Sequence, residues 1–186
     1  MTNAKLFLGL LVGIVLLACC GCSGAGGKEQ PAASPLKLEL ATWEQVQEVV
    51  AKSEGKVVVL DLWSTACSPC VRELPGLVKL AAKHEGRVVC LTFNCDFTGA
   101  KGEKPADGLP LIGKVLADKG FTGIAYVSSE PDDNIYQKSE TSTVPVVLVY
   151  DQNGKLKKRF EEDGSYGKEG FGYEKQIGPL VEELLK

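Results

Sequence analysis

The two cysteines Cys67 and Cys70 are separated by two residues and lie where a buried strand is expected to lead into a helix. The preceding run Val57–Leu60 is aliphatic and rich in β-branched residues, which is typical of a buried strand. After Cys70, apolar residues recur at helical spacing until Gly86 interrupts the pattern. The free N–H groups and the dipole at a helix start stabilise a thiolate and lower the pKa of the thiol. The spacing and position therefore predict a site for thiol–disulfide exchange.

The patterns around this site predict a domain of alternating strands and helices. Strands are predicted at 36–40, 57–63, 87–93, 124–127, 146–150 and 155–160. Helices are predicted from 43 to about 55, from 70 to 84, from 109 to 119, within 129–142 and from 177 to 185. This order predicts an α/β fold in which helices flank a mixed central sheet.

The N-terminus has the pattern of a targeting segment. Lys5 is the only charge before the apolar stretch 6–18, which has the length of a signal-peptide core and is short for a membrane span. The stretch ends in Leu-Leu-Ala followed by Cys19, which resembles a bacterial lipobox. The resemblance implies a lipoprotein signal peptide at 1–18 and lipidation of Cys19, with Cys22 as a second candidate. An ordinary cleaved signal is the alternative, and either one places the domain outside the cytoplasm, on the periplasmic side or at the cell surface.

Residues 19–35 are rich in Gly, Ser, Ala and Pro and are predicted to form a flexible linker. The linker would connect a lipid anchor in the membrane to a domain at 36–186. A chain of 186 residues is long enough to build a hydrophobic core, so its 7 cysteines are not needed merely for folding. The cysteines therefore call for a chemical explanation.

Charge and residue types argue against nucleic-acid and metal partners. The net charge is −3, and no basic stripe is present. The chain has a single histidine, His84, and the predicted domain at 36–186 has no second cysteine pair at ligand spacing, so no metal is expected. Cys90 lies in an apolar strand and is interpreted as a small buried hydrophobe. Cys95 follows the end of that strand and is either an auxiliary thiol or a tolerated cysteine.

Four separated motifs resemble the thioredoxin family. Asp61-Leu62-Trp63 precedes the cysteine pair, and Pro75 follows Cys70 by five residues, where thioredoxins have a helix-kinking proline. Val144-Pro145 precedes a strand at the place of the family's cis-proline loop, and the turn 151–154 follows that strand. The string Cys67–Pro75 is most similar to the extracytoplasmic TlpA/ResA-like branch. The resemblance implies a thioredoxin-like fold over most of residues 36–186.

The resemblance also implies roles for the residues of the cysteine site. Cys67 is the expected nucleophile, which attacks a partner disulfide and forms a mixed disulfide. Cys70 then attacks that bond, releases the partner and leaves a Cys67–Cys70 disulfide, so no other cofactor is expected. Asp61 is the expected acceptor of the Cys70 proton, and burial of its carboxyl should raise its pKa.

Four further residues complete the predicted site. Trp63, Val144 and Pro145 are expected to contact the partner protein, with backbone of Val144 exposed for pairing with an extended segment. Glu73 is interpreted either as a group that acts near the site or as an ordinary solvated helix residue. Ala66 stands where the family usually has Trp, so the loop before Cys67 is expected to be more open.

These features predict a bacterial, lipid-anchored thiol–disulfide oxidoreductase that acts on the thiols and disulfides of partner proteins. The resemblance implies reduction of partners such as apocytochrome c, with electrons from a membrane thiol-transfer protein. One alternative is a non-catalytic thioredoxin-like binding or metallochaperone module. The other is a peroxiredoxin-like peroxidase, although Ser64 stands where a T-x-x-C motif would require threonine.

Overall fold

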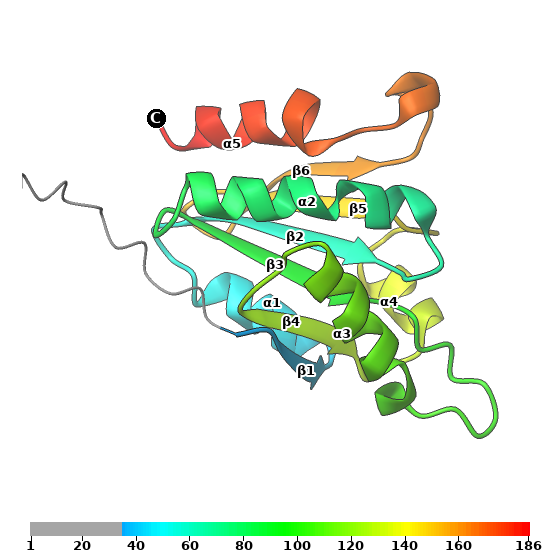
Figure 1. The fold of residues 1–186 in the computed structure, drawn as a ribbon. Helices are drawn as coiled ribbons and strands as arrows, with labels where there is room; N and C mark the ends of the chain where they lie inside the picture. Colours follow the sequence, from blue (N-terminus) through cyan, green and yellow to red (C-terminus); the bar gives the residue numbers. More distant parts are fainter. Residues whose placement is uncertain (1–34) are drawn as a thin grey trace, which may run out of the picture. The chain divides into compact units, whose positions relative to one another are not determined.

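The computed structural model describes residues 35–186, and Figure 1 shows the order of their helices and strands. The strands are β1 (Lys37–Ala41), β2 (Val57–Trp63), β3 (Val88–Asn94), β4 (Ile124–Ser128), β5 (Val146–Tyr150) and β6 (Leu156–Glu161). The α-helices of this part are α1 (Trp43–Ala51), α2 (Ser68–Lys83), α3 (Leu109–Asp118), α4 (Asp132–Lys138) and α5 (Gly178–Leu184). The predicted signal peptide at 1–18, Cys19 and all but the last residue of the linker at 19–35 lie outside the described residues.

The strands form one mixed sheet in the order β1-β4-β3-β2-β5-β6. The pairs β1–β4, β4–β3 and β3–β2 are parallel, and β5 is antiparallel to both β2 and β6. Every residue of β2 is buried, because this strand is central and both of its faces are covered. That position explains the continuous aliphatic run Val57–Leu60. The predicted thioredoxin-like α/β fold is confirmed.

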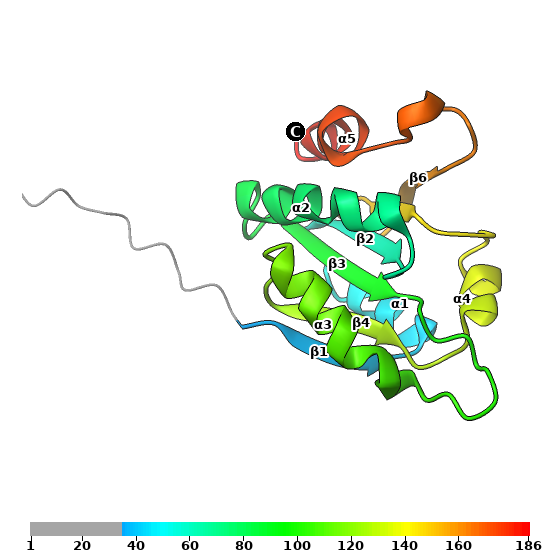
Figure 2. The same cartoon turned by 45° about the vertical axis from the view of Figure 1, so that its right-hand side comes forward.

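Two hydrophobic clusters cover the two faces of the sheet. One contains Val57 and Val59 of β2 together with apolar residues of α2, α3 and α5. The other contains Val58 and Leu60 of β2 together with residues of α1 and α4. Figure 2 shows α2 and α3 on the opposite side of the sheet from α1. Because side chains alternate along a strand, Asp61 points toward the face that α2 covers.

The ends of the helices agree only partly with the sequence patterns. Thr42 and Gln45 form a capping box at the start of α1, in which the Gln45 N–H donates to Thr42 Oγ1 (3.3 Å) and the Thr42 N–H to Gln45 Oε1 (2.9 Å). The C-terminal helix predicted at 177–185 is present as α5, but a π-helical turn at Tyr173–Ile177, which was not predicted, precedes it. Pro179 occupies the first turn of α5 and lacks an N–H to donate, which favours a new helix start there.

No helix within residues 35–186 has the length and apolar character needed to cross a membrane.

Candidate active site

The cysteine pair lies at the start of α2, on the loop that follows the central strand β2. Cys67 is the N-cap residue of α2, and a disulfide bond joins its Sγ to the Sγ of Cys70. The two Cα atoms are 5.3 Å apart. Cys67 is half-buried, whereas Cys70 is only 2% exposed. Of the two sulfurs, that of Cys67 is therefore the one a partner protein can reach.

The backbone at the start of α2 favours a negative charge on Cys67. The Cys70 N–H donates to Cys67 Sγ at 3.3 Å, as an N-cap interaction. The other N–H groups of the first helical turn and the helix dipole act in the same direction. Once the disulfide is reduced, these donors stabilise a Cys67 thiolate, the reactive form in thiol–disulfide exchange.

Asp96 holds the loop between β2 and α2. Its Oδ1 accepts a hydrogen bond from the Thr65 N–H (2.9 Å), and its Oδ2 accepts one from Thr65 Oγ1 (2.7 Å). The loop is closed by the Cys67 N–H, which donates to the Ser64 carbonyl oxygen at 3.1 Å. Ala66, between these contacts, is exposed. The position of Cys67 therefore depends on a carboxylate that follows the neighbouring strand β3.

The Asp96→Ala variant should lower the free energy of unfolding by about 1–3 kcal/mol, because two hydrogen bonds to a half-buried carboxylate are lost. The measurement is urea denaturation of the oxidised protein at pH 7. Thr65→Ala, which removes only the hydroxyl contact, is the matched control and should cost less. Equal stability of wild type and Asp96→Ala would show that Asp96 does not hold this loop.

Asp61 lies buried in β2, on the face covered by α2, and is 3% exposed. The Tyr173 hydroxyl donates a hydrogen bond to Asp61 Oδ2 at 2.5 Å. Burial raises the pKa of the Asp61 carboxyl from 3.8 to about 7; the Tyr173 hydrogen bond opposes the rise, and the nearby Glu73 adds to it. A carboxyl with a pKa near 7 can both accept and release a proton at neutral pH.

Glu73 is tied to the C-terminal segment rather than free in solvent. Its side chain is 29% exposed, and its Oε1 lies 3.3 Å from Arg72 Nε. Its Oε2 accepts a hydrogen bond from the Tyr173 N–H at 3.4 Å. The structure thus connects Glu73 with the Asp61–Tyr173 pair, which favours the interpretation of Glu73 as a group near the site.

The Val144–Pro145 peptide bond is cis, as the resemblance implied. Pro145 is buried and Val144 is half-buried. In the sheet Val146 pairs with Leu62, so the cis bond lies just beyond that pair, at the end of β2 that leads to the cysteine loop. The structure therefore brings the proline loop to the same end of the sheet as the cysteines.

Trp63 is placed differently from the prediction of a partner-contacting residue. Its side chain is completely buried in the cluster under α2, because odd-numbered residues of β2 point into that layer. It is a core residue in this structure and has no surface to offer a partner. Cys90 and Cys95 also lack the character of reactive thiols, since burial raises the pKa of Cys90 to about 12 and that of Cys95 still further.

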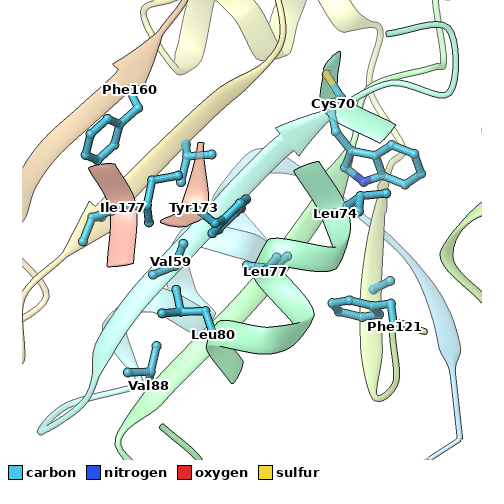
Figure 3. Close-up of a cluster of buried hydrophobic side chains, with 14 of the residues drawn as sticks. Val59, Cys70, Leu74, Leu77, Leu80, Val88, Phe121, Phe160, Tyr173 and Ile177 are labelled. Carbon is cyan, nitrogen blue, oxygen red and sulfur yellow. The ribbon is translucent and has the colours of Figure 1, made fainter. Parts of the chain in front are cut away.

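Tyr173 and Asp96 were missed by the sequence analysis. Figure 3 shows Tyr173 in the cluster that also contains Val59 and Leu77. Tyr173 follows a Gly-Phe-Gly segment that has no helical or strand periodicity, so no local pattern indicates that its hydroxyl reaches Asp61. The only sequence signal for the Asp96 contact is its place just beyond the end of a parallel strand, where polar residues often contribute to sites.

A helical N-terminus that carries a CxxC disulfide, a buried aspartate in the preceding strand and a cis-proline beside it define a thioredoxin-like redox protein. Comparison with known proteins agrees: the chain is 31% identical over 125 residues to the thioredoxin-like protein YneN of Bacillus subtilis, covering 59% of this chain and 71% of that protein. The chain belongs to the thioredoxin-like family. No family model matches the chain.

Two other similarities refine this assignment. The thiol–disulfide oxidoreductase ResA of Geobacillus thermodenitrificans is 28% identical over 105 residues, which cover 56% of this chain and 53% of ResA. This chain thus matches about half the length of that relative. The exposed lipoprotein thioredoxin of Streptococcus pneumoniae has a similar structure, with a TM-score of 0.51 and 25% identity over 73% of this chain and 90% of that one. These relatives confirm the prediction of a thioredoxin-like oxidoreductase and are consistent with the TlpA/ResA-like branch.

Proposed function

We propose that this protein is a membrane-anchored, extracytoplasmic thiol–disulfide oxidoreductase that reduces disulfides in partner proteins. The observation that carries the proposal is the arrangement of the Cys67–Cys70 pair. One sulfur is accessible at a helix N-terminus, and the other is buried on the side of β2 where Asp61 lies.

In the first step Cys67 forms a mixed disulfide with the partner protein. In the reduced protein the Cys67 thiolate attacks one sulfur of the partner disulfide. A mixed disulfide forms between Cys67 and the partner, the partner's own S–S bond breaks, and the leaving thiolate takes a proton from solvent. The donors at the start of α2 that stabilise the Cys67 thiolate make this attack possible at neutral pH.

The second step uses the buried pair of groups. Asp61 accepts the proton of the Cys70 thiol, and the resulting Cys70 thiolate attacks Cys67 Sγ. The mixed disulfide breaks, the Cys67–Cys70 disulfide forms, and the second partner sulfur leaves as a thiolate that solvent protonates. Two electrons have then passed from this protein to the partner. A pKa of about 7 for Asp61 suits it to this transfer.

The loop of Val144 and Pro145 is proposed to bind the partner's backbone. The half-buried Val144 lies two residues before the start of β5, where an extended segment could add main-chain hydrogen bonds beside Cys67. This geometry would hold a partner disulfide against the accessible sulfur.

The cellular setting is proposed from the N-terminal pattern and the relatives. The lipobox-like sequence before Cys19 supports a lipid anchor, and one structural neighbour is named an exposed lipoprotein. The TlpA/ResA-like resemblance supports apocytochrome c as one partner and a membrane thiol-transfer protein as electron donor. Mass spectrometry of the mature protein tests the anchor through the lipid mass expected on Cys19.

An equilibrium redox titration of the full-length chain in detergent, with Cys67→Ser as control, tests the activity. A Cys67-dependent two-electron couple at or below roughly −270 mV is expected for a reductant. A couple near roughly −120 mV would make the protein an oxidant. If no couple depended on Cys67, the oxidoreductase proposal would fail and a non-catalytic binding module would replace it.

A further inference from the structure

Tyr173 contacts the buried Asp61 from the C-terminal segment of the chain. It lies 112 positions beyond Asp61, in the π-helical turn that precedes α5. Its side chain is 4% exposed, and its hydroxyl donates to Asp61 Oδ2. A buried tyrosine hydroxyl is costly without an acceptor, so the two side chains satisfy each other.

The helix α2 is built to admit this tyrosine. A Cβ atom on Gly76 would lie 2.5 Å from Tyr173 Cβ and 2.8 Å from its Cγ, distances at which side chains clash. Gly76 therefore leaves the space through which Tyr173 passes α2 toward β2. Glycine is otherwise unfavourable within a helix, so its presence here is best explained by the close approach of Tyr173.

The backbone of the tyrosine is fixed as well. Glu73 Oε2 accepts the Tyr173 N–H at 3.4 Å, and the Gln176 side chain accepts the Gly172 N–H at 2.9 Å. Glu73 and Gly76 are one turn apart on α2, so one helix supports both the backbone and the ring of Tyr173.

We propose that Tyr173 is a positioning residue for the exchange reaction, because its hydroxyl orients the Asp61 carboxyl and stabilises the ionised form that accepts the Cys70 proton. This inference rests on the proposed function, in which Asp61 acts as that acceptor. A phenol donor bonded to one carboxylate oxygen leaves the other oxygen for the thiol. Without the donor, burial alone would keep the carboxyl protonated to higher pH.

The titratable groups that influence the Asp61–Tyr173 pair lie on α2, on β3 and directly after β3. Glu73 on α2 and Cys90 on β3 both influence the pair, and Cys95 after β3 senses the Asp61 charge. Both cysteine thiols stay neutral near pH 7, since burial raises the pKa of each. Tyr173 is therefore the hydrogen-bond donor that opposes the effects of burial and of Glu73 on Asp61.

The test is the Tyr173→Phe variant of the full-length protein, which keeps the ring and removes the hydroxyl. Pre-reduced protein is mixed with a disulfide-containing peptide, and release of the second peptide thiol is followed from pH 5 to pH 9. The acid limb of this rate should move up by about one pH unit, which makes release about tenfold slower below neutral pH. The Asp61→Asn/Tyr173→Phe double variant should be within about twofold of Asp61→Asn alone.

Tyr166→Phe is the matched control, because the Tyr166 ring packs against Phe171 (5.7 Å between centroids) and should leave the pH profile unchanged. An NMR titration of the Asp61 carboxyl carbon gives a readout without exchange activity. In wild type, burial raises the pKa of Tyr173, so its hydroxyl stays protonated and its ring resonances should shift at the midpoint of the Asp61 titration. In Tyr173→Phe the Asp61 midpoint should rise. An unchanged Asp61 midpoint, or no shared midpoint in wild type, overturns the role of Tyr173. If wild type releases no peptide thiol in a Cys67-dependent way, the proposed function itself is overturned.

Discussion

The Cys70→Ser variant should remain covalently attached to its partner after the first step of exchange. Cys67 is still accessible at the start of α2 and still attacks a disulfide. The variant lacks the Cys70 thiol that would release the partner. In wild type the Cα atom of Cys70 lies only 5.3 Å from that of Cys67. An intramolecular thiol acts at a very high effective concentration, so release by external thiols should be slower by about a thousandfold or more.

Non-reducing gels and mass spectrometry after incubation with a disulfide-containing peptide provide the measurement. The Cys70→Ser protein should gain the mass of one peptide half, whereas wild type should gain none and Cys67→Ser should be inert. Cys90→Ser is the matched control, since Cys90 lies in β3 and burial raises the pKa of its thiol to about 12, so that it should form no adduct. A stable adduct on Cys67→Ser would show that Cys70 attacks first. The absence of an adduct on Cys70→Ser would refute the role of Cys67 as nucleophile.

The Asp61→Asn variant should be more stable than wild type above neutral pH and slower in exchange. The folded protein holds the Asp61 proton up to a pH of about 7, whereas the unfolded chain releases it near 3.8. Native stability from this group is therefore complete below pH 3.8, declines as pH rises toward 7 and is absent above it. The difference corresponds to about 4 kcal/mol. Asparagine is uncharged and can still accept the Tyr173 hydrogen bond, so it should avoid this loss.

Urea denaturation of the oxidised proteins at pH 4.5, 6 and 8 tests this expectation. Wild type should lose stability across this range, and Asp61→Asn should lack that component. Asp118→Asn, an exposed change that breaks only the surface pair with Lys114, should alter stability by less than about 1 kcal/mol. The same Asp61→Asn protein should release partner thiols about a hundredfold more slowly, because the proton acceptor is gone. A wild-type pH dependence that persists in Asp61→Asn would assign the buried proton to another group.

Asp61 is expected to lower the stability of the protein at neutral pH and to speed up exchange, and the second effect explains why an ionisable residue occupies the central strand. A buried carboxyl without a cationic partner costs folding energy at neutral pH, and an apolar residue would fit β2 better. The cost is tolerated where a group must exchange protons with a buried thiol. Asp61 therefore fits a catalytic role better than a structural one.

Much of the fold and part of the site could be predicted from local sequence signals. The aliphatic run of β2, the helical spacing after Cys70 and the hairpin turn after β5 each depend on nearby residues, so periodicity and turn chemistry are sufficient to find them. The cysteine pair and Asp61 stood out for the same reason, as polar or reactive groups that interrupt an apolar pattern. The cis-proline was predicted from its place before a strand, by resemblance.

The amino-acid sequence by itself determined which elements form and where the reactive sulfurs lie along them. Only the tertiary structure decided which distant groups meet around those sulfurs. Tyr173 contacts Asp61 across the sheet–helix interface, and Asp96 holds the loop before Cys67 from the neighbouring strand. The burial of Trp63 was also decided there, by the face of β2 that α2 covers. Such contacts depend on packing between segments far apart in the chain, and local periodicity carries no information about which side chains packing will bring together.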